Sequence, residues 1–100
     1  MIERTWKGFA EISNADIYIE HLKADTFPKV RKITGNIDAR VLRRDLGSQV
    51  EFLVITTWTS MDAIKAFAGE NIEVAVVPAK AQAALSSYDE IVRHYKLIER

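Results

Sequence analysis

Glu51-Phe52-Leu53-Val54-Ile55-Thr56-Thr57-Trp58 is the stretch that decides the fold. Its apolar side chains stand at both odd and even positions, and β-branched and aromatic residues dominate it, which predicts a β-strand. Alternate side chains of a strand point to opposite faces of the sheet, so both faces of this strand need cover. The pattern therefore indicates a strand in the middle of a sheet.

The segments before this strand predict a strand, a helix and a second strand. Ile2–Phe9 has good β propensity, and Ser13 and Asn14 offer N-cap oxygens to a helix that begins at Ala15. Apolar residues then recur at three-and-four spacing, which predicts an amphipathic helix with one buried face. Pro28 predicts a break or kink near Phe27, and one further helical turn is expected before Gly35.

The rest of the chain completes an alternating pattern of strands and helices. In chain order we expect a strand at 37–41, a hairpin turn at Gly47-Ser48, the strand at 51–58, a helix capped by Ser60 and ended by Gly69, one or two helical turns at 72–77, a short helix at 79–85 and a strand at 89–98. The order β-α-β-β-α-β is that of the ferredoxin-like split unit, an α+β fold with an antiparallel sheet.

In that arrangement the first and third strands are central and both helices cover the same face of the sheet. The doubly apolar third strand agrees with a central position. The opposite face would then expose a large apolar patch, which typically marks an interaction surface. We therefore expect a second copy of the chain to cover it and to form a homodimer.

Composition restricts the chemistry without naming a reaction. The chain has 100 residues, 48% of them hydrophobic, and 14 basic residues balance 14 acidic ones. This predicts a single domain over residues 1–100, with no charge-based reason to expect nucleic acid or a membrane surface as a partner. Cysteine is absent, which excludes disulfides, thiolate metal sites and a cysteine nucleophile. The two histidines, far apart in the chain, match no metal-ligand spacing, so no metal is expected. No phosphate loop or dinucleotide glycine fingerprint occurs, so no other cofactor is expected either.

No apolar run approaches the roughly 20 residues needed to cross a bilayer, and the first ten residues lack the apolar core of a signal peptide. We therefore expect a cytoplasmic location.

The sequence resembles the antibiotic-biosynthesis-monooxygenase group of dimeric α/β-barrel proteins. The residues that carry the resemblance are Val41–Arg44, Glu51–Val54, Trp58–Gly69 and His94-Tyr95, after which Lys96 replaces the acidic residue of many small members. The resemblance implies a homodimer whose two sheets pack face to face, with small-molecule pockets between sheet and helices. It also implies cofactor-independent oxygenation of a small aromatic or phenolic compound.

The haem-degrading branch of this group matches less well. By this resemblance, members of the haem-degrading branch have an Asn on the first strand, a Trp at the end of the second helix and a His further along the chain. No Asn occurs between Ile2 and Ala10, Phe67 stands in the place of the Trp, and Val77 or a neighbour stands in the place of the His. Haem degradation is therefore not the expected activity.

Six residues are candidates for a ligand site, and each has a structural alternative. His94, supported by the resemblance, is the candidate catalytic base; the alternative is a half-buried, hydrogen-bonded histidine. Trp58 and Trp6 are candidate walls for an aromatic ligand, and otherwise pack helices onto the sheet. Arg4 is a candidate to hold a phenolate or carboxylate, and otherwise stacks on an indole at the rim. His21 is a candidate to line a pocket together with Tyr18, and is otherwise a solvated histidine at the helix edge.

Two functions stay open at this point. One is a cofactor-independent monooxygenase acting on a small aromatic compound, with His94 as the base. The other is a non-catalytic dimeric protein for small-ligand binding or a stress response, which would use the same cleft. Fold alone does not separate them. Convergence of ionisable groups in a closed pocket would favour the enzyme.

Overall fold

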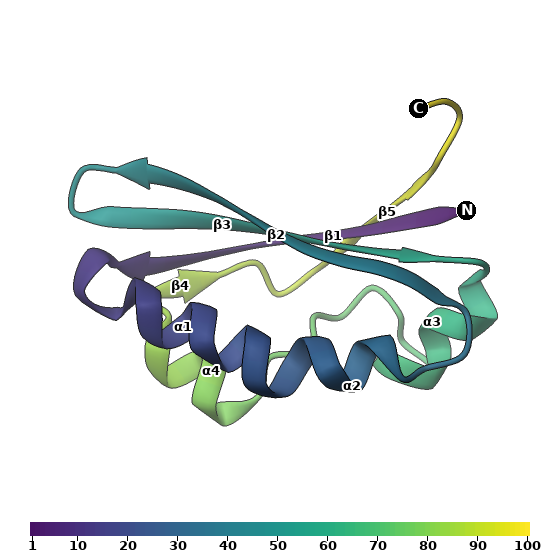
Figure 1. The fold of residues 1–100 in the computed structure, drawn as a ribbon, viewed down its shortest axis with the longest axis horizontal. Helices are drawn as coiled ribbons and strands as arrows, with labels where there is room; N and C mark the ends of the chain where they lie inside the picture. Colours follow the sequence, from purple (N-terminus) through teal and green to yellow (C-terminus); the bar gives the residue numbers. More distant parts are fainter.

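The computed structural model describes all 100 residues and contains one antiparallel sheet with every helix on the same side (Figure 1). Its strands are β1 (Ile2–Glu11), β2 (Asn36–Leu46), β3 (Gln49–Trp58), β4 (Ser87–Tyr88) and β5 (Arg93–Lys96). The order is β2-β3-β1-β4, and β5 pairs with the same edge of β1 as β4. The prediction that the first and third strands are central is therefore confirmed.

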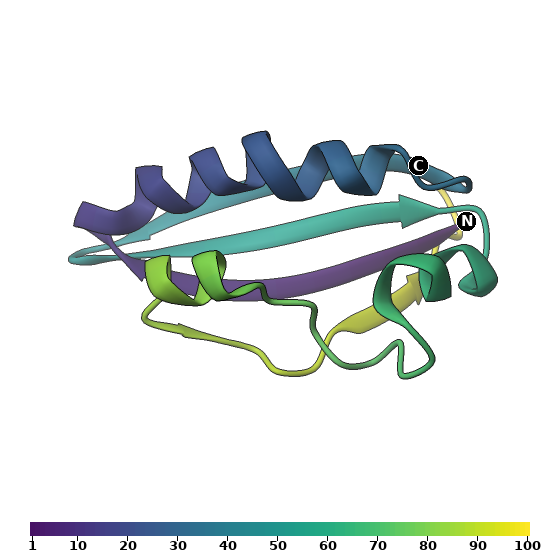
Figure 2. The same ribbon diagram turned by 90° about the horizontal axis from the view of Figure 1, so that it is seen from below.

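The helices form one layer beneath this sheet. They are α1 (Ala15–His21), α2 (Phe27–Arg31), α3 (Met61–Ala68) and α4 (Ala79–Ala84), with a 3₁₀ turn at Ile12–Asn14 and a π turn at Leu22–Thr26. Figure 2 shows the continuous helical segment of α1, the π turn and α2 along one side of the layer, and α3 and α4 along the other. No helix is long and apolar enough to span a membrane.

The hydrophobic core lies between the sheet and the helices. Phe52 and Trp58, at even positions of β3, are fully buried against Tyr18 of α1 and Ile64 of α3 in a single cluster. The odd positions of β3 face the other way. Both parities of this strand thus carry apolar side chains, as the sequence predicts, but the helices cover only one set.

The other side of the sheet, here called the uncovered face, has no layer packed on it (Figure 1). The alternation along the paired strands places on it Glu3, Thr5, Lys7, Phe9, Arg40, Leu42, Leu53, Ile55, Thr57 and Tyr95. Leu42 and Tyr95 remain 46% and 53% exposed.

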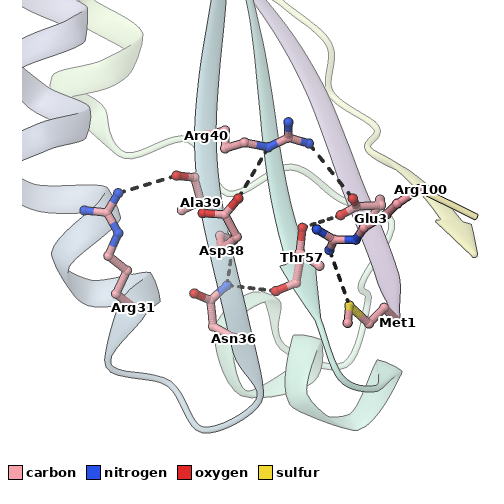
Figure 3. A network of polar contacts seen from close by, with 9 residues as sticks. All are labelled: Met1, Glu3, Arg31, Asn36, Asp38, Ala39, Arg40, Thr57 and Arg100. Carbon is pink, nitrogen blue, oxygen red and sulfur yellow. Dashed lines mark hydrogen bonds and ion pairs between the residues drawn. The ribbon is translucent and has the colours of Figure 1, made fainter. Parts of the chain in front are cut away.

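Near the start of β1 this face also carries contacts among Glu3, Asp38, Arg40 and Thr57, which Figure 3 shows. The Thr57 hydroxyl donates to Glu3, and Arg40 bridges Glu3 at 4.0 Å and Asp38 at 3.4 Å.

The sequence predicts a break or kink near Phe27; the structure has no break there, but a π turn interrupts the α-helix directly before Phe27. The Phe27 N–H donates to the carbonyl of Leu22, five residues back, so the chain passes through a π turn just before the proline. In a regular α-helix a proline ring collides with the carbonyl four residues before it and removes one hydrogen bond. The wider turn absorbs this conflict, and the helix continues into α2.

The expected helical turns at 72–77 are absent, and this part of the prediction is wrong. Residues 73–75 instead pair with residues 90–92: Val92 N–H donates to Glu73 O, and Ala75 N–H donates to Glu90 O, both at 2.8 Å. Because residues 90–92 pair with this segment and not with β1, the last strand begins at Arg93 and not at Asp89, and it ends at Lys96, two residues before the predicted end.

Candidate functional site

A cavity of about 60 Å³ lies between the sheet and the helix layer. Eleven of its sixteen lining residues are hydrophobic, and none is an aspartate or glutamate. The sheet, the continuous helix, α3, α4 and the irregular segment before α4 all contribute to a lining made of Arg4, Trp6, Tyr18, His21, Leu22, Thr26, Phe27, Val30, Val54, Thr56, Phe67, Val76, Val77, Pro78, Ala81 and Val92.

Arg4 is the only charged residue of the lining and is almost completely buried, at 4% exposure. Its Nη1 donates to the carbonyl of Ile72 and to Nε2 of His94, the latter at 3.0 Å, and its Nη2 donates to the carbonyl of Val74 at 3.3 Å. No carboxylate forms an ion pair with it. Burial lowers the pKa of Arg4 to about 10, so the guanidinium stays protonated near neutral pH. The cavity therefore contains a desolvated positive charge with only neutral partners.

Trp58 does not line this cavity, so its predicted role as a ligand wall is not supported. It is completely buried, its ring stacks on Phe67 with centroids 6.0 Å apart, and its Nε1 donates to the Thr56 hydroxyl at 2.8 Å. Phe67 and Thr56 do line the cavity, and the Phe67 centroid lies 5.8 Å from Cζ of Arg4. Trp58 thus supports two residues of the wall from behind, as its packing alternative predicted.

Trp6 and Tyr18 meet in the cavity wall, with ring centroids 6.4 Å apart. Trp6 Nε1 donates to the Asp89 carbonyl at 2.6 Å, which holds the indole in place. Burial raises the pKa of Tyr18 well above its ordinary value, so its phenol stays protonated at physiological pH. It is therefore a permanent hydrogen-bond donor.

His21 borders the same cavity, and its partner there is Thr26. The His21 Nε2 and Thr26 Oγ1 atoms are 3.2 Å apart. In a regular α-helix, residues five apart point in different directions. The π turn between them brings both side chains to the cavity. Sequence reasoning missed Thr26, because a π turn has no periodicity signal of its own.

His94 is not among the residues that line this cavity. It pairs with Arg4 across β1 and β5 and borders a shallow, open depression that includes Met61 and Glu73. Burial lowers the pKa of His94, the neighbouring Arg4 charge lowers it further, and Glu73 acts in the opposite direction. Arginine only donates hydrogen bonds, so this contact requires an unprotonated Nε2. His94 does not line the cavity itself, but it contacts the cavity residue Arg4.

The structure therefore brings together four of the six candidates, Arg4, Trp6, Tyr18 and His21, and sets His94 and Trp58 behind them. No group of three His, Cys, Asp or Glu side chains is placed to hold a metal ion.

The sequence matches no family model, and no curated protein matches it significantly. Solved structures do resemble it along its whole length. A proposed antibiotic biosynthesis monooxygenase from Bacillus cereus superposes with a TM-score of 0.69 at 19% identity, over 100% of this chain and 95% of the other. One from Deinococcus radiodurans gives 0.65 at 15% identity over the same shares, and a further antibiotic biosynthesis monooxygenase gives 0.65 at 12% over 99% and 100%. The chain has the fold of the antibiotic biosynthesis monooxygenases.

Within this fold, the cavity lacks two residues that the haem-degrading branch is expected to have. Phe67 and Val77, which stand where the haem-degrading branch is expected to have Trp and His, line the cavity as apolar side chains and offer no ligand to iron. A space of about 60 Å³ is also far smaller than a tetrapyrrole.

Proposed function

We propose that the chain is a cytoplasmic, homodimeric, cofactor-independent monooxygenase of a small aromatic or phenolic compound. The observation that carries the proposal is a mostly apolar cavity into which a few polar groups, Arg4, Tyr18 and His21, converge. Such an enclosure with a small number of converging polar side chains is the usual form of a small-molecule site. The likeness to antibiotic biosynthesis monooxygenases supports the reaction class only by analogy.

His21 is the base that we propose, in place of His94. Imidazole is the side chain whose charge changes near neutral pH, and His21 borders the cavity whereas His94 does not. The Thr26 hydroxyl can hold the His21 ring in one orientation. His94 is then a positioning residue, which acts on the cavity through its contact with Arg4.

The chemistry needs only the substrate and dioxygen. His21 takes the proton of the phenol, and the electron-rich phenolate reacts with dioxygen at a ring carbon that carries hydrogen. One oxygen atom becomes the new carbonyl of a quinone, and the other leaves as water with the phenol proton and the ring hydrogen. The substrate supplies all four electrons that reduce dioxygen, so no external reductant is required. The protein contributes a base, an orienting donor and a dry enclosure.

The size of the cavity favours a substrate with one ring. Apolar cavities near 150 Å³ hold benzene, whereas this one measures about 60 Å³. A single ring therefore enters only if the wall yields. The irregular residues before α4, including Val76, Val77 and Pro78, are the part of the wall outside regular secondary structure.

Dimerisation through the uncovered face completes the proposal. Its exposed apolar side chains, such as Leu42 and Tyr95, are the kind of surface that a second subunit covers. Each chain has a mass of 11.4 kDa, so sedimentation or light scattering should give about twice that value. A monodisperse species of about 11 kDa at micromolar concentration would contradict the dimer.

The test of the reaction has two steps. One-ring phenols are first screened for thermal stabilisation of the protein, and oxygen uptake and quinone absorbance are then followed with each compound that stabilises it. His21→Gln should abolish turnover while leaving stabilisation in place, and His94→Gln should reduce turnover only partly. If His94→Gln abolishes turnover and His21→Gln reduces it only partly, the catalytic base is His94 and not His21.

Stabilisation without oxygen uptake would instead favour the non-catalytic ligand-binding alternative. One observation supports that alternative: the only charged group of the cavity is an arginine, which binds anions but does not exchange protons near neutral pH.

A further inference from the structure

The guanidinium of Arg4 has unused hydrogen-bonding capacity. A guanidinium carries five N–H groups, and Arg4 donates three, to Ile72 O, Val74 O and His94 Nε2. Two N–H groups, one of them on Nε, have no partner in the protein. All three acceptors are neutral, so none offsets the charge.

The hydroxyl of Tyr18 is another unused hydrogen-bond donor in the same cavity. Its hydroxyl makes no hydrogen bond in the protein, although only 2% of the residue is exposed. Every side-chain nitrogen or oxygen atom that is completely inaccessible to solvent has a hydrogen-bond partner. The free Nε of Arg4 and the hydroxyl of Tyr18 must therefore border open space. Since both residues are nearly absent from the outer surface and both line the cavity, that space is the cavity.

The other groups around the cavity leave the positive charge uncompensated. The lining includes no carboxylate, and apart from Arg4 and Tyr18 its only titratable side chain is His21. Glu73, the acidic residue that influences His94, borders another depression and does not line the cavity. The aromatic residues Trp6, Phe27 and Phe67 also line the cavity.

We propose that Arg4 and Tyr18 form a receptor for one anionic oxygen group, so that the cavity selects a one-ring aromatic ligand in its singly charged form, as a carboxylate or as a phenolate. This rests on the proposed function only in using the same cavity, and it makes no claim about turnover. A buried charge whose existing partners are all neutral is the setting in which a charge-assisted hydrogen bond is strongest.

The test compares matched ligands that differ in charge. Benzoate, benzamide and benzyl alcohol are titrated into the intact protein by calorimetry. We expect benzoate to bind roughly tenfold tighter than benzamide or more, the effect of one charge-assisted hydrogen bond. Equal or weaker binding of benzoate, or no binding of any of the three up to millimolar concentration, would overturn the proposal.

Two variants test the residues themselves. Tyr18→Phe removes a hydroxyl without a protein partner, so stability should be unchanged while benzoate binds several-fold more weakly and benzamide much less so. Arg4→Met should abolish the preference for benzoate, whereas Arg4→Lys should keep part of it. Arg4→Met also removes the contacts with Ile72 and Val74, so Tyr18→Phe decides the outcome if that variant fails to fold. Unchanged benzoate affinity in Tyr18→Phe would refute the shared receptor.

A nitrophenol, whose phenolate is coloured, separates the two sources of the anion. If phenolates are accepted, the bound phenol should titrate at lower pH than the free one, and Arg4→Lys should keep most of this shift. A bound phenol that titrates at higher pH, together with tight benzoate binding, would restrict the receptor to carboxylates. Benzoate has no oxidisable phenol group, so its binding is measured independently of oxygen uptake. If the monooxygenase proposal fails, tight binding of benzoate would still support the anion receptor. If phenols are oxidised but bind only in their neutral form, the anion receptor is refuted and the monooxygenase proposal is not.

Discussion

Gly8 provides the surface against which the cavity residue Trp6 packs, and Gly8→Ala tests this directly. A Cβ built at Gly8 would lie 2.6 Å from Cη2 and 3.0 Å from Cζ3 of the Trp6 ring, and 3.4 Å from a methyl group of Leu85. To restore ordinary contact the indole would have to shift by about 0.8 Å. The ring is held by its hydrogen bond to Asp89, so it can yield only at the expense of that bond or of the cavity.

Overpacking of this kind costs about 1 to 3 kcal/mol, and we expect Gly8→Ala to lower the free energy of unfolding by that amount. Without the clash, Gly8→Ala should instead raise the free energy of unfolding, because alanine in a strand is favoured over glycine by roughly 0.5 to 1 kcal/mol. Trp6→Phe removes the two ring atoms that the new Cβ meets. Gly8→Ala in the Trp6→Phe background should therefore be neutral or stabilising.

The assay is a double-mutant cycle of the two substitutions by urea denaturation, followed by circular dichroism because Trp6→Phe alters the fluorescence signal. The coupling free energy should be at least about 1 kcal/mol. If Gly8→Ala costs the same in both backgrounds, or stabilises the protein that retains Trp6, the packing argument is wrong. As a second readout, Gly8→Ala should weaken benzoate binding, since the displaced indole borders the cavity.

Three further predictions concern His94, the uncovered face and the π turn. The pKa of His94 is lowered in the folded state, so the unfolded state binds a proton first as the pH falls. The free energy of unfolding should therefore be highest above the ordinary histidine pKa range and decline as the pH falls through that range. Denaturation midpoints measured across the range should show a flatter decline for His94→Gln. Leu53→Lys on the uncovered face should shift the sedimenting mass toward that of one chain, whereas the control Ile17→Lys, at a helix position already 59% exposed, should not; equal effects would argue against this interface. Thr26→Val keeps the side-chain shape but removes the contact with His21, and it should lower kcat for phenol oxidation several-fold with a stability change below about 1 kcal/mol. The control Thr26→Ser keeps the hydroxyl and should retain kcat. An unchanged kcat in Thr26→Val would exclude an orienting role for the hydroxyl.

The fold could be predicted because its signals are local. Apolar residues at both parities of β3 indicated a central strand, and β3 lies between β1 and β2. Ser60 caps α3 by accepting from the Ala63 N–H at 3.2 Å, and Gly69 ends that helix with a φ of 81°, as the sequence suggested. Each of these features depends on residues within one turn or one strand. Short-range rules therefore sufficed to predict them.

The candidate site was harder to predict because it depends on contacts between distant parts of the chain. Arg4 could be identified as an anion-binding candidate, but its lack of a carboxylate partner depends on the carbonyls of residues 72 and 74 and on His94. The irregular course of residues 72–77 follows from their pairing with residues 90–92, which helix propensity does not anticipate. His94 and Trp58 were predicted as the catalytic base and a ligand wall, but neither lines the cavity. Only the three-dimensional arrangement shows that they lie behind its wall.

The π turn has a consequence for how this fold can vary. Counted along the chain, Leu22–Thr26 uses one residue more than a regular α-helix would need to join the same two packed halves, which are fixed by Tyr18 on one side and by Phe27 and Val30 on the other. It is equivalent to a single-residue insertion that the core tolerates because neither half has to move. Length variation of one residue inside a helix can thus change which side chains border a ligand cavity while the core on both sides stays the same.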